Sequence, residues 1–208
     1  MEFTHWLSLL GICLLGAMSP GPSLAVVLKC VLESGRPAGI RAALAHGAGV
    51  GLYGLLTVAG LAGLIATNPT VFRALQVAGA LYLVYLGIRA LRSGGPAQPT
   101  DTPASSPVSR PAVDGFMVAF LNPKLAVFML ALFSQFLQPS FGLLAKGLMA
   151  LTVGLTDALW YCLVVLLVSH PAFVARLRNT ATVIERCFGV ILIALAVSVL
   201  ANSLRDVL

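Results

Sequence analysis

Two short stretches decide how this chain folds: Ser19-Pro20-Gly21-Pro22 and Leu121-Asn122-Pro123-Lys124. Each interrupts a long apolar segment with prolines, which have no backbone N–H and leave carbonyl groups one helical turn earlier without partners. Lipid cannot pair such groups, so helix breaks inside a membrane persist only where protein or a water-filled cavity surrounds them. We therefore expect the carbonyls of Gly16, Met18 and Ala119 to be freed at the breaks and to face the protein interior.

The composition places the chain in a membrane. Hydrophobic residues make up 59% of the 208 residues and charged residues only 10%, and the mean hydropathy is +0.97. Soluble domains carry about 25% charged residues. The net charge of +6 therefore does not indicate nucleic-acid binding, and we attribute it to Lys and Arg in cytoplasmic loops. The expected surroundings are membrane lipid, with no nucleic-acid partner.

A transmembrane helix needs about 20 apolar residues, and six segments reach or approach this length. We interpret the first as a retained span rather than a cleaved signal peptide, because no positive charge precedes it and a break interrupts it. The predicted spans are 6–28, 42–66, 71–88, 116–137, 144–168 and 184–200.

A polar segment divides the spans into two halves. Residues 93–113 are mostly Pro, Ser, Thr, Gly and Ala; such a composition buries too little apolar surface to fold, and we expect a flexible cytoplasmic linker. It separates a first three-helix repeat, 1–92, from a second, 114–208, within one transmembrane domain. The predicted fold class is an all-α integral membrane protein with six transmembrane helices, of which the first and fourth are broken.

The positive charges predict the orientation. Nine Lys and Arg residues follow the first, third and fifth spans, whereas three lie on the other side. The positive-inside rule puts the nine in the cytoplasm, so both termini are predicted to lie outside.

The two halves resemble a repeat. Because three spans per half reverse the orientation of the second half, a duplication of this kind is a 3+3 inverted repeat. Paired breaks in such halves are a sequence sign of a transport site. The matched positions are Pro20 with Pro123 and Gly51 with Gly154, both 103 apart, and Gly79 with Gly189, 110 apart.

Two charged residues lie deep in the predicted spans. Lys124 follows the second break, and Asp157 lies near the middle of the fifth span. A charge at the bilayer centre costs at least ~2.5–3.5 kcal/mol and marks a functional-site hypothesis. Lys124 and Asp157 are expected to pair with each other. Alternatively, burial makes Asp157 a proton carrier.

The second span combines His46 with a GxxxG face formed by Gly47 and Gly51. This face predicts close helix packing, and we expect it to press against the broken first span. We expect His46 to face the cytoplasmic interface, with a pH-sensing role as the alternative.

The chain carries no hydrolase, metalloprotease or phosphate-binding motif. Its four cysteines are scattered and form no CxxC pair, so they are interpreted as packing residues rather than metal ligands. An enzyme, a bound cofactor and a metal site are therefore not predicted.

With these motifs, six predicted spans and a polar central linker, the chain resembles the LysE/RhtB family of bacterial amino-acid exporters. The matching stretches are Ser19-Pro20-Gly21-Pro22, Gly79-Ala80-Leu81-Tyr82-Leu83-Val84-Tyr85-Leu86-Gly87, and Gly115-Phe116 leading to Leu121-Asn122-Pro123-Lys124. The resemblance implies a bacterial cytoplasmic-membrane exporter of amino acids or related metabolites, driven by the proton gradient. The chain departs from the family at Ser23, where members commonly have Asn, so its substrate can differ from theirs.

The residues then predict alternating access around one midplane cavity. Backbone N–H groups and Lys124 would hold a substrate carboxylate, and the freed carbonyls at the two breaks would meet the substrate's ammonium group. Asp157 would couple protons or balance Lys124. Export of a metal ion or other small solute, a passive channel and an intramembrane enzyme are the alternatives, and a homo-oligomer stays open. The predicted substrate-binding residues are Ser19, Pro20, Gly21, Pro22, Asn122, Pro123 and Lys124.

Overall fold

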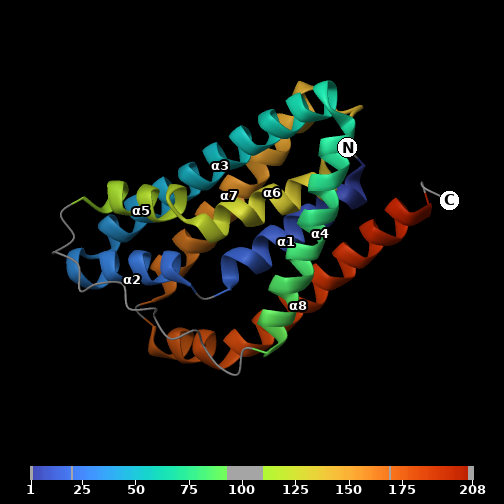
Figure 1. Ribbon diagram of the computed structural model, residues 1–208. Coiled ribbons are helices and arrows are strands. Elements are labelled where there is room, and N and C mark those ends of the chain that lie inside the picture. The colour runs from blue at the N-terminus through green and yellow to red at the C-terminus, as the bar shows by residue number, and fades with distance from the viewer. Residues whose placement is uncertain (1, 20, 93–109, 169, 206–208) are drawn as a thin grey trace.

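Helices build the whole of the described fold. The computed structural model describes residues 2–19, 21–92, 110–168 and 170–205, which form eight helices and no strand (Figure 1). This confirms the predicted all-α class. The helices are α1 (Phe3–Met18), α2 (Pro22–Ser34), α3 (Arg36–Thr67), α4 (Pro69–Arg92), α5 (Pro111–Phe120), α6 (Pro123–Phe136), α7 (Leu143–Leu167) and α8 (Pro171–Arg205).

Both predicted breaks separate a pair of sharply bent helices. The axes of α1 and α2 differ by 58°, and those of α5 and α6 by 55°. Among the described residues, four continuous helices are long and apolar enough to cross a membrane, and the number is six if each bent pair is one span. Pro22 and Pro123 each begin the second helix of a pair, where a missing N–H costs no helical hydrogen bond. Pro20 lies outside the described residues.

At each break, a backbone carbonyl that was expected to be free accepts a local hydrogen bond. The Ser19 N–H donates to the Gly16 carbonyl at 3.3 Å, and the Asn122 N–H donates to the Ala119 carbonyl, also at 3.3 Å. The prediction that the carbonyls of Gly16 and Ala119 are free was therefore wrong, because a tight turn supplies each with a new donor. This local pairing lowers the cost of ending a helix inside a membrane.

Glycines bring α3 and α7 into contact along their length. A Cβ atom on Gly47 would lie 2.7 Å from the carbonyl oxygen of Gly154, and one on Gly154 would lie 2.9 Å from the Cα of Gly51. The GxxxG face was correctly predicted to pack closely. Its partner, however, is α7 and not the broken first span.

A second glycine contact joins α4 to α8. A Cβ atom on Gly87 would lie 2.7 Å from the carbonyl oxygen of Gly189, and the reverse distance is the same. Gly79, which we matched to Gly189, instead packs against Ser134 and Ala131 of α6. Gly87 and Gly189 are 102 positions apart, close to the 103 that separates the other matched pairs.

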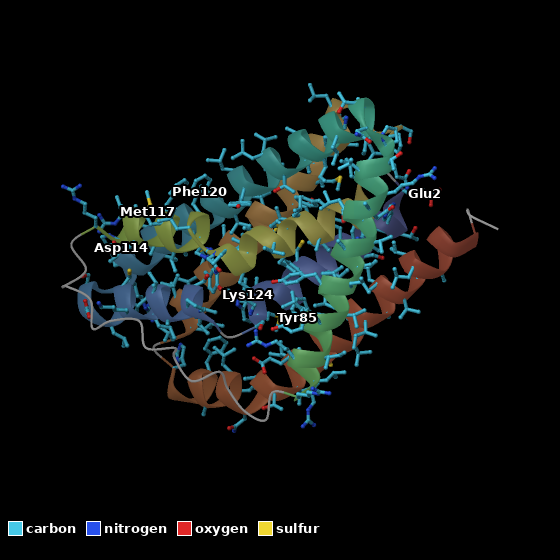
Figure 2. All side chains as sticks on the ribbon, in the orientation of Figure 1. Glu2, Tyr85, Asp114, Met117, Phe120 and Lys124 are labelled. Atoms are coloured by element: carbon cyan, nitrogen blue, oxygen red, sulfur yellow. The ribbon has the colours of Figure 1, made fainter. Side chains whose placement is uncertain are left out.

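Different helix termini and connections lie at the two ends of the molecule. The start of α1, the end of α8 and the connections α3–α4 and α6–α7 lie at one end, and the connections α2–α3 and α7–α8 lie at the other (Figure 1). Glu2 and Asp114 mark the opposite ends, while Lys124 lies between them (Figure 2). Helix α5 begins at Pro111, before the expected boundary at Asp114, and 93–109 lie outside the described residues.

Leucines on α7 present an apolar face to the surroundings. They recur every three or four residues, as one face of a helix requires, and each is about half exposed or more. Soluble monomers rarely expose a continuous apolar face of this kind to water, so the face is suited to contact with lipid. Its members are Leu148, Leu151, Leu155, Leu159, Leu163 and Leu166.

Candidate functional site

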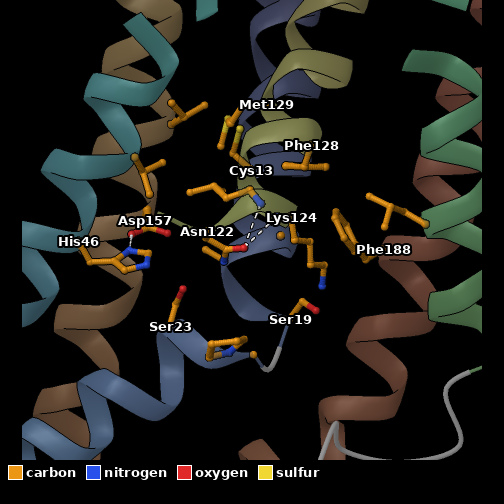
Figure 3. Close-up of a pocket in the computed structure, with 18 of the residues that line it drawn as sticks. Cys13, Ser19, Ser23, His46, Asn122, Lys124, Phe128, Met129, Asp157 and Phe188 are labelled. Carbon is orange, nitrogen blue, oxygen red and sulfur yellow. Dashed lines mark hydrogen bonds and ion pairs between the residues drawn. The ribbon is translucent and has the colours of Figure 1, made fainter. Parts of the chain in front are cut away.

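A pocket of about 250 Å³ lies where the two helix breaks meet α3, α4, α7 and α8 (Figure 3). Its apolar walls include Phe128 and Phe188, whose rings contact edge to face at 5.9 Å between centroids. Its polar lining is formed by Ser19, Ser23, His46, Arg89, Asn122, Lys124, Asp157, Tyr161 and Glu185.

The structure brings most of the predicted site residues to this one pocket. Those that line it are Ser19, Gly21, Pro22, Asn122, Lys124 and Asp157. Pro20 lies outside the described residues, and Pro123 begins α6 between two lining residues without being a lining residue itself. Residues about 100 positions apart thus share one cavity, as expected if the two breaks form one site.

Asp157 is paired with His46. The Nδ1 atom of His46 lies 2.5 Å from Oδ2 of Asp157, and both side chains are buried, with His46 only 2% exposed. The structure therefore contradicts two expectations: Asp157 does not pair with Lys124, and His46 does not face the cytoplasmic interface. The reason is the glycine contact of α3 with α7, which brings the two side chains together from adjacent helices.

Two hydroxyl groups, those of Tyr161 and Ser23, lie next to the His46–Asp157 pair. The Tyr161 ring stands edge-on to the His46 ring at 5.0 Å between centroids, and the Tyr161 hydroxyl is hydrogen-bonded to the Ser23 side chain. Ser23 belongs to α2 just after the first break. The break is thereby joined to the His46–Asp157 pair through one aromatic residue of α7.

Lys124 lies on the opposite wall of the pocket from His46 and Asp157 (Figure 3). Its side chain is exposed to the cavity, and the charges of Arg89 and Glu185 act on it. The Asn122 side-chain oxygen accepts hydrogen bonds from the backbone N–H groups of Lys124, at 3.0 Å, and Leu125, at 3.3 Å. Asn122 therefore caps α6 and fixes the start of the helix that carries Lys124, which leaves its NH₂ group as a donor.

Packed apolar side chains close the described interior between this pocket and the end where α1 begins, and a separate pocket at that end is lined by Glu2, His5, Gln138, Ser140 and Phe141. Leu9, Leu61, Phe133 and Phe136 are at most 2% exposed between the pocket and the end where α1 begins. Two hydrogen bonds tie the helices together there: Trp6 Nε1 donates to Thr152 Oγ1 at 2.9 Å, and Gln135 Nε2 donates to the Gln76 carbonyl at 3.0 Å.

Five polar lining residues were not among the predicted site residues, although a pH-sensing role had been the alternative for His46: Ser23, His46, Arg89, Tyr161 and Glu185. The signal for His46 was present in the glycines. If Gly51 faces Gly154 across antiparallel helices, residues before Gly51 lie opposite residues after Gly154, which brings His46 to the level of Asp157. The approach of α4 and α8 to the breaks, which places Arg89 and Glu185, carried no such signal.

The comparisons with known proteins agree with this architecture. The model of the LysE type translocator family matches residues 14–203. The chain belongs to the LysE type translocator family. It is a membrane transporter and not an enzyme, as predicted from the sequence. No solved structure matches the chain.

Relatives of this translocator include named efflux proteins. The chain is 29% identical over 168 residues to the leucine efflux protein of Klebsiella pneumoniae, covering 77% of this chain and 76% of the relative. It is 29% identical over 148 residues to the homoserine/homoserine lactone efflux protein of Salmonella typhimurium, with 71% and 72% covered. An uncharacterized membrane protein of Pseudomonas aeruginosa is 30% identical over 153 residues, with 71% and 70% covered.

Proposed function

We propose that this translocator exports amino acids or closely related metabolites from the cytoplasm, coupled to protons, by alternating access. The observation that carries the proposal is a small pocket with a cationic wall at Lys124 and an anionic wall at Asp157. An α-amino acid carries one group of each charge on the same carbon. The pocket is complementary to such a zwitterion.

The carboxylate is assigned to the Lys124 side of the pocket. The Lys124 ammonium group and the Asn122 NH₂ group are donors on this wall, and charge-assisted hydrogen bonds to a carboxylate are about twice as strong as neutral ones. Arg89 adds positive charge, and Glu185 adds negative charge that a bound carboxylate has to outcompete. The breaks contribute mainly shape, since Ser19, Gly21 and Pro22 form the adjoining wall.

The ammonium group is assigned to Asp157. One carboxylate oxygen of Asp157 is held by His46, and the side chain stays 12% exposed on the pocket side. Asp157 also supplies the negative charge through which export couples to protons. Phe128, Phe188 and Met129 supply apolar lining to the same pocket, which suits a small uncharged side chain.

An inverted repeat would account for alternating access. The hydrogen bonds that close the two breaks, Ser19 to Gly16 and Asn122 to Ala119, are 103 positions apart and equally long. The contact of Gly51 with Gly154 has the same offset, and a reciprocal contact between equivalent residues is expected on a two-fold axis. Rocking one half against the other about this axis would open the closed end.

The orientation follows the charges. The residues of α4 that line the pocket, among them Arg89, lie in the C-terminal half of this helix. This half leads to Arg92 and the linker. The positive-inside rule assigns this end to the cytoplasm and both termini to the outside of a bacterial inner membrane. On this assignment the pocket would take up cargo from the cytoplasmic side. Export of a metal ion has less support: in the described part of the chain, no three His, Cys, Asp or Glu side chains form a metal-binding group.

Efflux from loaded proteoliposomes tests the proposal. The purified protein is reconstituted with radiolabelled leucine or homoserine on the pocket side, and release is followed with and without an opposing proton gradient. Saturable release that the gradient accelerates is expected. Release no faster than from protein-free liposomes, together with no growth rescue of exporter-deficient cells by any single amino acid challenge, would contradict it.

A further inference from the structure

His46 has a polar atom that nothing in the described protein satisfies. Its Nδ1 atom is engaged with Asp157, whereas Nε2 is buried and has no hydrogen-bond partner among the described residues. A ring nitrogen with a fixed partner has its protonation set by that partner. Since Nε2 has none among the described residues, its lone pair is the place on this ring where an added proton would bind.

The charge of the pair depends on whether that proton is bound. With a neutral His46 donating from Nδ1 to an ionised Asp157, the pair carries one negative charge. A proton on Nε2 makes the pair neutral. An ammonium group bound to Asp157 also makes the site neutral. Both at once would leave an uncompensated positive charge in a buried site, which is costly.

The other described ionisable groups around His46 and Asp157 do not take the place of His46 as the proton-binding group. Cys13 and Tyr161 face Asp157 from α1 and α7 and are neutral near pH 7 in their ordinary forms. Arg89 and Lys124 are cations and Glu185 is a carboxylate, all lining the rest of the pocket. Cys30 of α2 lies in the apolar cluster with Tyr161, and Asp114 lies in the first turn of α5, at the end of the molecule opposite Glu2. Of these groups, histidine is the type whose ordinary charge change lies between pH 5 and 8.

We propose that His46 is the proton-binding residue of the pocket, and that its proton and the ammonium group of the cargo compete for the single negative charge of Asp157. This inference rests on the proposed export of amino acids. The proton binds the Nε2 lone pair, and Asp157 stays ionised throughout. Cargo therefore binds the deprotonated pair, and a proton arriving at His46 expels it.

Competition of this kind gives export its direction. The cytoplasm is the more alkaline side of an energised bacterial membrane, so the pair is deprotonated there and accepts cargo. The outer side is more acidic, so His46 takes up a proton and the cargo leaves. The proton then returns inward with the empty carrier. Each cycle exchanges one proton for one cargo molecule without both occupying the site.

The pH dependence of cargo binding tests this exchange. Leucine, with homoserine as a second probe, is titrated into the detergent-purified full-length protein between pH 5 and pH 9. The dissociation constant is expected to be constant at alkaline pH and to rise about tenfold per pH unit on the acid side, as for a competing proton. His46→Asn keeps an amide N–H where Nδ1 donates to Asp157 but cannot titrate. Its dissociation constant is expected to be the same at every pH in this range.

Comparing leucine–leucine exchange with proton-driven net efflux separates proton binding from a purely structural role of His46. In proteoliposomes with His46→Asn, the rate of leucine–leucine exchange is expected not to change with pH, and a proton gradient is expected no longer to drive net efflux. His5→Asn is the matched control: His5 lies outside the pocket, against the Phe136 ring of α6 at 5.0 Å. This variant is expected to keep the wild-type pH profile. A wild-type pH profile in His46→Asn would overturn the proposal.

A measurement on the unmodified protein covers the case in which the variant does not fold. Leucine added to wild-type protein in weak buffer, at a pH on the acid side of the wild-type binding profile, is expected to release protons that an indicator dye detects. Binding without proton release would overturn the His46 assignment and leave the proposed function intact. Failure of the wild-type protein to bind either amino acid would contradict the proposed function as well.

Discussion

Gly51 of α3 and Gly154 of α7 meet backbone to backbone: a Cβ atom on Gly154 would lie 2.9 Å from the Cα of Gly51. The two glycines are 103 positions apart, the spacing that also separates the two helix breaks. This contact sets the level at which α3 and α7 cross and so brings His46 to Asp157, with 2.5 Å between Nδ1 and Oδ2. Helix packing and site chemistry therefore depend on the same residues.

Filling this interface should destabilise the protein. In Gly47→Val the added Cβ would meet Ala158 and the Gly154 carbonyl oxygen at 2.5 and 2.7 Å, and overpacking of this kind costs about 1–3 kcal/mol. We expect a lower midpoint of thermal unfolding in detergent. Gly60→Val is the control on the same helix, because no atom lies within 4 Å of a Cβ there. Equal midpoints for both variants would refute the packing role.

Removing the cation of the pocket should abolish transport without removing the protein from the membrane. In Lys124→Met the proposed carboxylate site loses its charge, and truncating one partner of a charge pair costs on the order of 2–5 kcal/mol. Amino-acid affinity is then expected to fall by about thirtyfold or more, measured by binding and by efflux from preloaded vesicles. Lys146→Met, near the start of α7 and outside the pocket, should behave as wild type. Full efflux by Lys124→Met would exclude the carboxylate role.

The Asn122 side chain is predicted to matter for the position of Lys124. Asn122→Ala removes the oxygen that accepts from the Lys124 and Leu125 N–H groups, and loss of such a cap costs about 1 kcal/mol. Both the unfolding midpoint and the efflux rate should fall. Asn122→Ser retains a capping oxygen but no amide NH₂ group, so it should recover the midpoint. If it recovers the efflux rate too, the NH₂ group has no part in binding cargo.

Neutralising Asp157 should remove both cargo affinity and pH dependence. Asp157→Asn keeps a hydrogen-bond acceptor for His46 but has no negative charge to hold an ammonium group or to favour a proton on His46. Efflux should drop, and the remaining rate should be the same across pH 5–8 in proteoliposomes. Asp114→Asn, at the start of α5 outside the pocket, is the control. A residual rate that still follows the wild-type pH profile would show that protons act elsewhere.

The breaks were predictable because their cause is local. A proline lacks its N–H in any environment, so Pro22 and Pro123 could begin helices but not continue them, and the bends of 58° and 55° follow at these places. The spans were predictable for a similar reason: their apolar length must match the bilayer. The charged residues deep in those spans marked Lys124 and Asp157 as site residues before any contact was known.

The partner of Asp157 was decided only by the tertiary structure. Charge alone favoured Lys124, the other deep ion in the sequence. The glycine face of α3 instead admits the backbone of α7, and this proximity gives Asp157 to His46 and leaves Lys124 exposed to the cavity beside Arg89 and Glu185. The sequence by itself determined where the helices end, because that depends on groups within one turn. Which charges meet depends on how closely distant helices pack, and that was settled by the fold.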